Sequence, residues 1–204
     1  MIAIVDYGRG NLGSVEKAFR RVGIPASITQ DPRTVDEAEA VVLPGDGAFH
    51  DAMATLQALG LLEPIRGCLD DGRPFFGICL GYQLLFTESE EFGHTKGLDV
   101  VGGVVRRLPR GLKVPHMGWN QVGHDGRIPL FDGIPSGAHF YFVHSYYPDV
   151  SDGSVAVATC EYGIPFTAAL ARDNLFGTQF HPEKSQRWGL RMLENFAAVV
   201  KSGR

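Results

Sequence analysis

The chain has 204 residues, of which 44% are hydrophobic and 21% are charged, a composition typical of a globular protein with a sizeable buried core. Its net charge of −4 comes without a basic patch, which excludes nucleic acid as an expected partner. No apolar run is long enough to cross a bilayer, and the first residues lack the basic region of a signal peptide. The chain has three cysteines, a small and odd number that argues against a framework of disulfide bonds. We therefore expect a protein of the reducing cytoplasm.

The first half of the chain is predicted to alternate between short apolar strands and helices. The expected strands are continuous apolar runs at residues 1–6, 26–29, 41–43 and 74–78. We expect helices over residues 11–22 and 50–69, the second broken or double, and helical character over residues 80–86. Strands that are apolar on both faces and alternate with helices indicate a parallel sheet covered on both sides.

The second half is predicted to consist mainly of strands that turn residues separate without intervening helices. These strands cover residues 100–108, 114–121, 139–147, 154–160, 166–171 and 175–180. A final helix is expected over residues 185–200. The prediction is therefore a single α/β domain over residues 1–204, with three layers: a mixed, mostly parallel central sheet flanked by helices, carrying an antiparallel extension.

Cys79 lies between two glycines where an apolar strand meets a helix, in the segment GICLG (77–81). This pattern is typical of a nucleophile elbow, a sharp turn that presents a reactive side chain above the sheet edge. The helix N-terminus favours a thiolate there, and the Leu80 N–H can hold an oxyanion. A buried cysteine that serves only as a small apolar residue explains the local pattern equally well. Neither Cys68 nor Cys160 has glycines two residues to either side, so we interpret both as structural.

His181 is the best candidate for a base that activates Cys79, because it follows the strand predicted over residues 175–180. Glu183 comes two residues later, so in extended backbone both side chains point to the same side and Glu183 can orient the imidazole. Pro182 disfavours the α conformation at His181. Taken alone, the motif also fits a surface histidine ahead of a helix. No other pair has compact metal-ligand spacing, so we expect no metal site.

Three segments resemble the sequence blocks of the class I, or triad, glutamine amidotransferases. GICLGYQLLF (77–86) and GTQFHPEKS (177–185) are similar to the two catalytic blocks, and LPGDGAF (43–49) is similar to the oxyanion strand. The resemblance implies a flavodoxin-like fold and a triad of Cys79, His181 and Glu183 that hydrolyses L-glutamine through a thioester, without a cofactor. It also implies that the oxyanion hole and substrate pocket are formed by Gly45, Asp46, Gly47, Leu80, Gln83, His144, Ser145 and Tyr146.

Three further segments, residues 1–15, PHMGWN (115–120) and HFYFVHSYY (139–147), resemble one branch of this family. In that branch the glutaminase forms a heterodimer with a cyclase subunit of histidine biosynthesis, a (β/α)8 barrel into which ammonia passes. The resemblance implies that the glutaminase is nearly inactive without its partner. The positions it implies for the interface and the ammonia passage are Tyr141, Lys184, Trp119, Asn120 and Asn11.

Asp46 departs from the family pattern, in which this position of the oxyanion strand is commonly valine. A backbone N–H supplies the same hydrogen bond from either residue, but a carboxylate beside a developing oxyanion is unfavourable. We therefore predict that Asp46 points outward. We also expect the glycine-rich turn 45–47 to move when the partner is loaded, because glycine permits a peptide flip.

Two alternatives stay open at this point. The partner could differ, because triad glutaminases also serve pyridoxal phosphate, anthranilate, GMP, CTP and carbamoyl phosphate synthesis. The chain could instead be a binding protein with an inactive site, or a cysteine protein built on a related α/β sheet. Those related proteins usually place a histidine directly beside the elbow cysteine, where this chain has Leu80.

Overall fold

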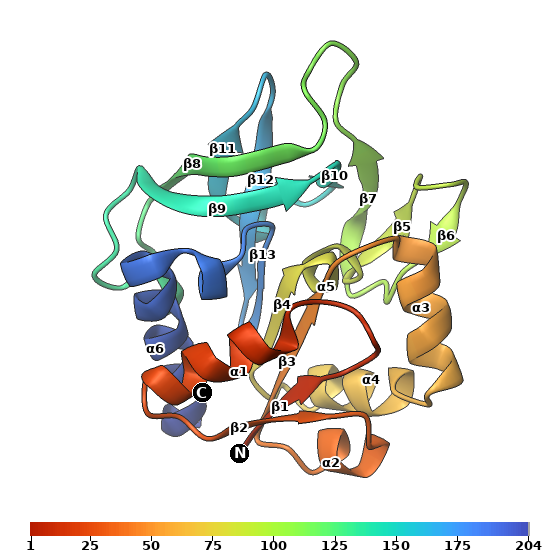
Figure 1. Ribbon diagram of the computed structural model, residues 1–204, viewed down its shortest axis with the longest axis vertical. Coiled ribbons are helices and arrows are strands. Elements are labelled where there is room, and N and C mark those ends of the chain that lie inside the picture. Colours follow the sequence, from red (N-terminus) through yellow and green to blue (C-terminus); the bar gives the residue numbers. More distant parts are fainter. Residues whose placement is uncertain (204) are drawn as a thin grey trace.

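The structure, a computed structural model, describes residues 1–203 of the chain. Its strands are β1 (Ile2–Val5), β2 (Ala26–Thr29), β3 (Ala40–Gly45), β4 (Phe75–Cys79), β5 (Phe86–Ser89), β6 (Thr95–Lys96), β7 (Val101–Arg107), β8 (His116–His124), β9 (Ala138–His144), β10 (Tyr146–Val150), β11 (Ala156–Glu161), β12 (Pro165–Arg172) and β13 (Leu175–Thr178). Its α-helices are α1 (Leu12–Arg21), α2 (Pro32–Asp36), α3 (Phe49–Ala58), α4 (Leu62–Asp70), α5 (Leu80–Gln83) and α6 (Gln186–Ser202) (Figure 1). Short 3-10 helices are η1 (Pro129–Phe131), η2 (Gly153–Val155) and η3 (Pro182–Lys184).

The large sheet has nine strands in the order β2-β1-β3-β4-β13-β12-β11-β8-β9. The pairings from β2 to β13 are parallel, and those from β13 to β9 are antiparallel. This confirms the predicted mixed sheet with an antiparallel extension. A separate sheet of four strands, in the order β10-β7-β5-β6, lies beside it.

Helices cover both faces of the parallel part of the large sheet, which gives the three predicted layers (Figure 1). Helices α1 and α6 pack on one face, and α2, α3 and α4 pack on the other. Each face of the sheet packs into its own hydrophobic core, and alternate residues of a strand point to opposite faces. In β1, Ile2 and Ile4 are in the core under α1 and α6, and Ala3 and Val5 are in the other core. Burial on both faces explains why these strands read as continuous apolar runs.

Two predicted elements are wrong in their extent. Helical character was expected over residues 80–86, but α5 ends at Gln83 and Phe86 begins β5. The Leu85 carbonyl accepts hydrogen bonds from the amides of Val100 and Val101, so pairing with the distant β7 region overrides the local helical pattern. The strand expected over residues 139–147 is two strands, because the chain turns at Ser145 and β10 then pairs with β7 in the second sheet.

Other boundaries shift less. The helix expected over residues 50–69 is two helices, α3 and α4, one of the two forms predicted. The strand expected over residues 175–180 ends at Thr178. Three elements were not predicted: α2, β5 and β6 are at most five residues long and so carry little periodicity.

Candidate active site

Three parallel strands end side by side and carry the residues predicted to perform chemistry. Gly45, at the end of β3, is in register with Cys79, at the end of β4. On the other side of β4, Ile78 is in register with Thr178, the last residue of β13. The carboxyl ends of adjacent parallel strands are where open α/β sheets place their sites. The register therefore brings together segments that lie about a hundred residues apart, as the Gln179–Cys79 contact across 100 residues illustrates.

The turn at Cys79 has the strained backbone of a nucleophile elbow. Cys79 adopts φ 54° and ψ −105°, a conformation that residues other than glycine rarely adopt. Gly81 lies so close to β3 that a Cβ there would overlap the Leu43 carbonyl oxygen. Leu80 is the first residue of α5, so its N–H has no acceptor within the helix, and Leu80 lines the pocket beside Cys79.

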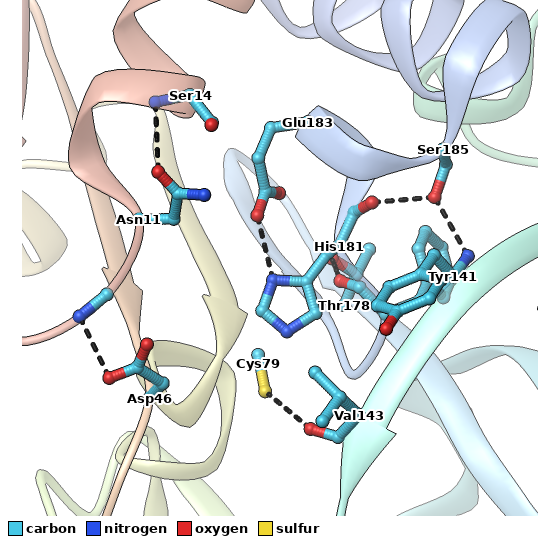
Figure 2. Close-up of polar contacts among 12 residues, drawn as sticks. Asn11, Ser14, Asp46, Cys79, Tyr141, Val143, Thr178, His181, Glu183 and Ser185 are labelled. Atoms are coloured by element: carbon cyan, nitrogen blue, oxygen red, sulfur yellow. Dashed lines mark hydrogen bonds and ion pairs between the residues drawn. The ribbon is translucent and has the colours of Figure 1, made fainter. Parts of the chain in front are cut away.

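His181 and Glu183 form a buried hydrogen-bonded pair next to the sulfur. The Nδ1–H of His181 donates to Oε1 of Glu183 over 2.8 Å, and both side chains are almost fully buried. This bond fixes the tautomer, leaving Nε2 as the basic atom. Among residues 1–203, Nε2 has no hydrogen-bond partner, and Figure 2 shows it facing Cys79. Burial acts to lower the pKa of His181, but the Cys79 sulfur and then the Glu183 carboxylate raise this pKa above its ordinary value.

The local backbone of this pair differs from the sequence prediction. His181 is extended, with φ −103° and ψ 97°, in agreement with the effect expected of Pro182. Glu183 is not extended, because it lies in η3. The contact arises because the 3-10 turn folds the carboxylate back onto the imidazole, rather than because two extended residues share a face.

Strand β9 anchors His181 through the backbone and Ser185. The His181 N–H donates to the Tyr141 carbonyl over 2.9 Å, and the Ser185 hydroxyl donates to the His181 carbonyl over 2.6 Å. The Tyr141 N–H in turn donates to the Ser185 Oγ over 3.0 Å (Figure 2). These bonds join the antiparallel extension to the carboxyl end of the parallel strands, and they set the position of the imidazole.

The sulfur lines a pocket of about 480 Å³. The predicted site residues that line this pocket are Cys79, His181, Asp46, Gly47, Leu80, Gln83, His144, Ser145, Tyr146 and Lys184. Glu183 is outside the lining because it lies behind the imidazole. Gly45 lies beneath, where a Cβ would overlap the buried Tyr7 hydroxyl. Three residues that were not predicted as site residues also line the pocket: Glu91, Pro115 and Val143.

A row of buried and half-buried polar side chains lies behind the pocket wall that His144 lines. His144 Nδ1–H donates to the Tyr146 carbonyl over 2.9 Å, so its Nε2 must accept, and the donor is His116 Nδ1–H at 2.8 Å. The Asn120 amide then donates to His116 Nε2 over 3.2 Å and to the Glu161 carbonyl over 2.9 Å. Burial lowers the pKa of His116 to about 4 and that of His144 to about 3, so both imidazoles are neutral at pH 7.

Asp46 is exposed, and its carboxylate is directed away from the sulfur. Oδ1 of Asp46 accepts a hydrogen bond from the Gly10 N–H over 3.1 Å (Figure 2). The outward orientation agrees with the sequence prediction. Gly47 follows with φ 90°, a conformation that glycine adopts without strain. Arg9, on the same loop as Gly10, reaches over Gly47 and pairs with Asp51 of α3 at 3.3 Å.

The residues predicted for an interface occupy different places. Trp119 and Tyr141 are opposite each other on β8 and β9, with ring centroids 6.1 Å apart, and the Lys184 ammonium lies 5.9 Å from the Tyr141 ring. The Trp119 side chain is 46% exposed. Asn120 is the next residue of β8, so its side chain points to the opposite face of the strand, where it contacts His116. Asn11 lies elsewhere again, and its side chain caps α1 by accepting from the Ser14 N–H (Figure 2).

The comparisons with known proteins identify the family. The sequence matches the family described as glutamine amidotransferase class-I over residues 3–200. The chain belongs to the class I glutamine amidotransferases. It has the expected fold, and the enzyme interpretation of the triad motifs is confirmed over that of a binding protein. Within the described residues, no cluster of three or more His, Cys, Asp or Glu could hold a metal ion. No helix of residues 1–203 is long and apolar enough to span a membrane.

Curated relatives of this glutamine amidotransferase are named imidazole glycerol phosphate synthase subunit HisH. The relative from Syntrophotalea carbinolica is 56% identical over 203 residues, covering 96% of this chain and 98% of the relative. The relative from Moorella thermoacetica is 55% identical over 200 residues, covering 98% and 95%. These matches confirm the branch of the family that residues 1–15, 115–120 and 139–147 indicate, and each relative is named as one subunit of a larger enzyme.

Solved glutamine amidotransferases share the fold at much lower identity. One has a TM-score of 0.78 with 19% identity, covering 98% of this chain and 100% of that structure's chain. A glutamine amidotransferase from Thermotoga maritima has a TM-score of 0.67 with 21% identity, covering 98% and 84%. At these identities the likeness concerns the arrangement of helices and strands alone.

Proposed function

We propose that this class I glutamine amidotransferase hydrolyses L-glutamine with the triad Cys79, His181 and Glu183, and supplies the ammonia to a cyclase subunit of imidazole glycerol phosphate synthase. The observation that carries the proposal is the buried His181–Glu183 pair at 2.8 Å, whose free Nε2 faces the Cys79 sulfur at a strained elbow. A nucleophile, a base and a group that orients the base are the parts that acyl transfer from an amide requires.

The proton follows the hydrogen bonds of the triad. His181 Nε2 takes the proton of Cys79, and the sulfur attacks the side-chain carbonyl carbon of glutamine. The oxyanion that forms is next to the Leu80 N–H and the turn 45–47, which supply backbone donors. His181 then gives its proton to the leaving nitrogen, and ammonia departs from a thioester. Water, deprotonated by the same Nε2, releases glutamate and restores the thiol, while Glu183 stabilises the imidazolium in each cycle.

The rest of the pocket is suited to the amino-acid end of glutamine. Gln83, Ser145 and Tyr146 offer backbone and amide groups beside the sulfur, and Lys184 lies at the same wall. A neutral His144 suits this location, because a second imidazolium would oppose the one that forms at His181. These groups bind a zwitterion through hydrogen bonds, and they place its side chain toward Cys79.

The partner in this proposal is a (β/α)8-barrel cyclase that forms a heterodimer with the chain in the cytoplasm. Trp119, Tyr141 and Lys184 form a partly exposed aromatic and cationic group near the pocket, which is a suitable contact surface. Asn11 and Asn120 stay predicted interface residues. The Asn11 side chain also caps α1, and the Asn120 side chain also hydrogen-bonds to His116. The whole of residues 1–204 acts as one glutaminase domain.

The test is glutamate release by the chain co-purified with its cyclase, in the presence of the nucleotide ligand of the cyclase. We expect Cys79→Ala to abolish activity, because the covalent step loses its nucleophile. Cys160→Ala is the matched control, because Cys160 is also a buried free cysteine but lies on β11, away from the pocket lining. Glutamate release by the Cys79→Ala complex, or none by the unaltered complex, would refute the proposed function. A different barrel protein as the co-purifying partner would refute the pathway alone.

A further inference from the structure

Gln179 is a fully buried polar residue between the end of β13 and His181, and it has no role in the proposed triad. It lies within the strand predicted over residues 175–180, where no local pattern indicates a role for a glutamine. A buried side-chain amide is unfavourable unless its polar atoms are hydrogen-bonded. Both ends of this amide do have partners, and both partners belong to the candidate active site.

The hydrogen bonds around Gln179 fix which of its atoms faces the sulfur. The Tyr146 carbonyl can only accept, so the Gln83 atom that contacts it at 2.9 Å is the nitrogen. The second hydrogen of that Gln83 nitrogen donates to Gln179 Oε1 over 3.0 Å. Gln179 Nε2 therefore faces Cys79 Sγ, at 3.7 Å. The orientation follows from a single carbonyl acceptor that cannot change its role.

Besides facing His181, the sulfur contacts two groups with opposite preferences for its protonation state. The Cys79 thiol donates to the Val143 carbonyl over 3.8 Å, an acceptor that favours the protonated form (Figure 2). The Gln179 amide is a donor, which favours the thiolate because a hydrogen bond to a charged atom is stronger than one to a neutral atom. When the proton moves to His181, the contact with Val143 weakens and the contact with Gln179 strengthens.

We propose that Gln179 is a further catalytic residue of the glutaminase reaction: its Nε2–H holds the Cys79 thiolate, and its Oε1 holds the Gln83 amide in the glutamine pocket. The inference rests on the proposed function, in which Cys79 is the nucleophile and Gln83 contacts the substrate. One side chain thereby links the attacking atom to the group that positions the substrate. A buried amide with only a packing role would not contact the reacting sulfur.

Two substitutions separate the two ends of the amide. In Gln179→Glu a carboxylate keeps an acceptor for Gln83 but faces the sulfur without a donor. Gln179→Met keeps the approximate length of the side chain and removes both contacts. Tyr82→Phe is the matched control, because the Tyr82 hydroxyl is equally buried and donates to the Thr167 carbonyl over 3.1 Å, without contact to the sulfur.

The first measurement is the rate at which iodoacetamide alkylates Cys79 at each pH, followed by mass spectrometry of the Cys79 peptide in the full-length complex. We expect the midpoint of this profile to move up by about one pH unit in Gln179→Met, which corresponds to a tenfold smaller thiolate population. The shift should be larger in Gln179→Glu, because two negative groups would face each other. Tyr82→Phe should keep the profile of the unaltered protein.

The second measurement is glutamate release by the same complexes. We expect kcat to fall about tenfold or more in both variants, on the scale of one lost hydrogen bond to a charged group. KM should rise in Gln179→Met alone, because only that variant releases Gln83. Unchanged alkylation profiles in both Gln179 variants would overturn the inference. Glutamine hydrolysis absent in the unaltered complex would overturn the proposed function, and the alkylation profiles would still decide whether Gln179 holds the thiolate.

Discussion

The parallel and antiparallel parts of the large sheet build opposite walls of one pocket by different physical means. In the parallel part, apolar burial on both faces fixes the strands, and close glycine contacts fix the turn at Cys79. In the antiparallel part, a row of neutral, hydrogen-bonded side chains supports β9 and His144. The first kind of support does not depend on pH, whereas the second fails when an imidazole takes up a proton.

This difference suggests a division of labour within the site. The nucleophile must keep a strained backbone at all times, so its support is steric and permanent. The pocket wall that His144 lines must hold polar groups in fixed directions, so its support is a set of hydrogen bonds. The turn at Asp46 belongs to neither kind, because the contacts that hold it, the Asp46–Gly10 hydrogen bond and Arg9 over Gly47, lie at the exposed surface.

The largest effect is expected from Gly81→Ala, which breaks the steric support. The added Cβ would overlap the Leu43 carbonyl oxygen, so β3 or the elbow has to move. We expect the free energy of unfolding to fall by about 4 kcal/mol or more, at the upper end of single substitutions. Urea unfolding at pH 7 measures this, with Gly13→Ala as the control, because a Cβ at Gly13 meets no atom within 4 Å. Equal unfolding midpoints for the two variants would contradict the steric account.

The next largest effect is expected from pH acting on the buried histidines. Folded His116 has a pKa lowered to about 4, whereas the unfolded chain binds that proton near pH 6.5. The unfolded state therefore binds more protons between these values, and stability falls as the pH decreases from about 7 toward 4. His144, with a pKa lowered to about 3, acts in the same direction.

His116→Phe should remove one of these two contributions. Phenylalanine can keep the stacking on Tyr162 and Phe142, although His144 Nε2 loses its donor. We expect the loss of stability between pH 7 and pH 4.5 to become about 2 kcal/mol smaller than in the unaltered protein. Urea unfolding at several pH values measures it, with His94→Gln, an exposed position, as the control. The same pH dependence in His116→Phe and the unaltered protein would mean that His116 takes up its proton in the folded state.

The smallest effect is expected from Asp46→Val in the exposed turn. The carboxylate loses one hydrogen bond to the Gly10 amide, so the change in stability should stay within about 1 kcal/mol. Activity with the partner should be nearly unchanged, because the backbone N–H of residue 46 remains. Glutamate release with and without the cyclase checks this. A large rise in glutamate release without the cyclase would show that the Asp46 carboxylate inhibits the glutaminase activity.

Much of the parallel part could be predicted from local sequence. Residues 1–6, 41–43 and 74–78 read as buried strands because their apolar side chains contribute to cores on both faces, whereas residues 26–29 form the half-buried edge strand β2. The antiparallel part was harder, since β9 and β10 form one aromatic run in the sequence. The chain changes sheets at Ser145 because β9 pairs with β8 and β10 pairs with β7, and no local sequence pattern predicts these pairings.

The sequence by itself determined the strand–helix alternation, the glycine-flanked Cys79, the His181-Pro182-Glu183 motif and the family that they indicate. These features are local, because the backbone conformation and the burial of a segment restrict which residue types occur at neighbouring positions. Only the tertiary structure decided that Gln83 meets Gln179 across 96 residues, that His116 supports His144, and that Asp46 bonds to Gly10. Such polar contacts depend on the register of strands that are distant in the chain, so the choice of partner is made by the fold as a whole.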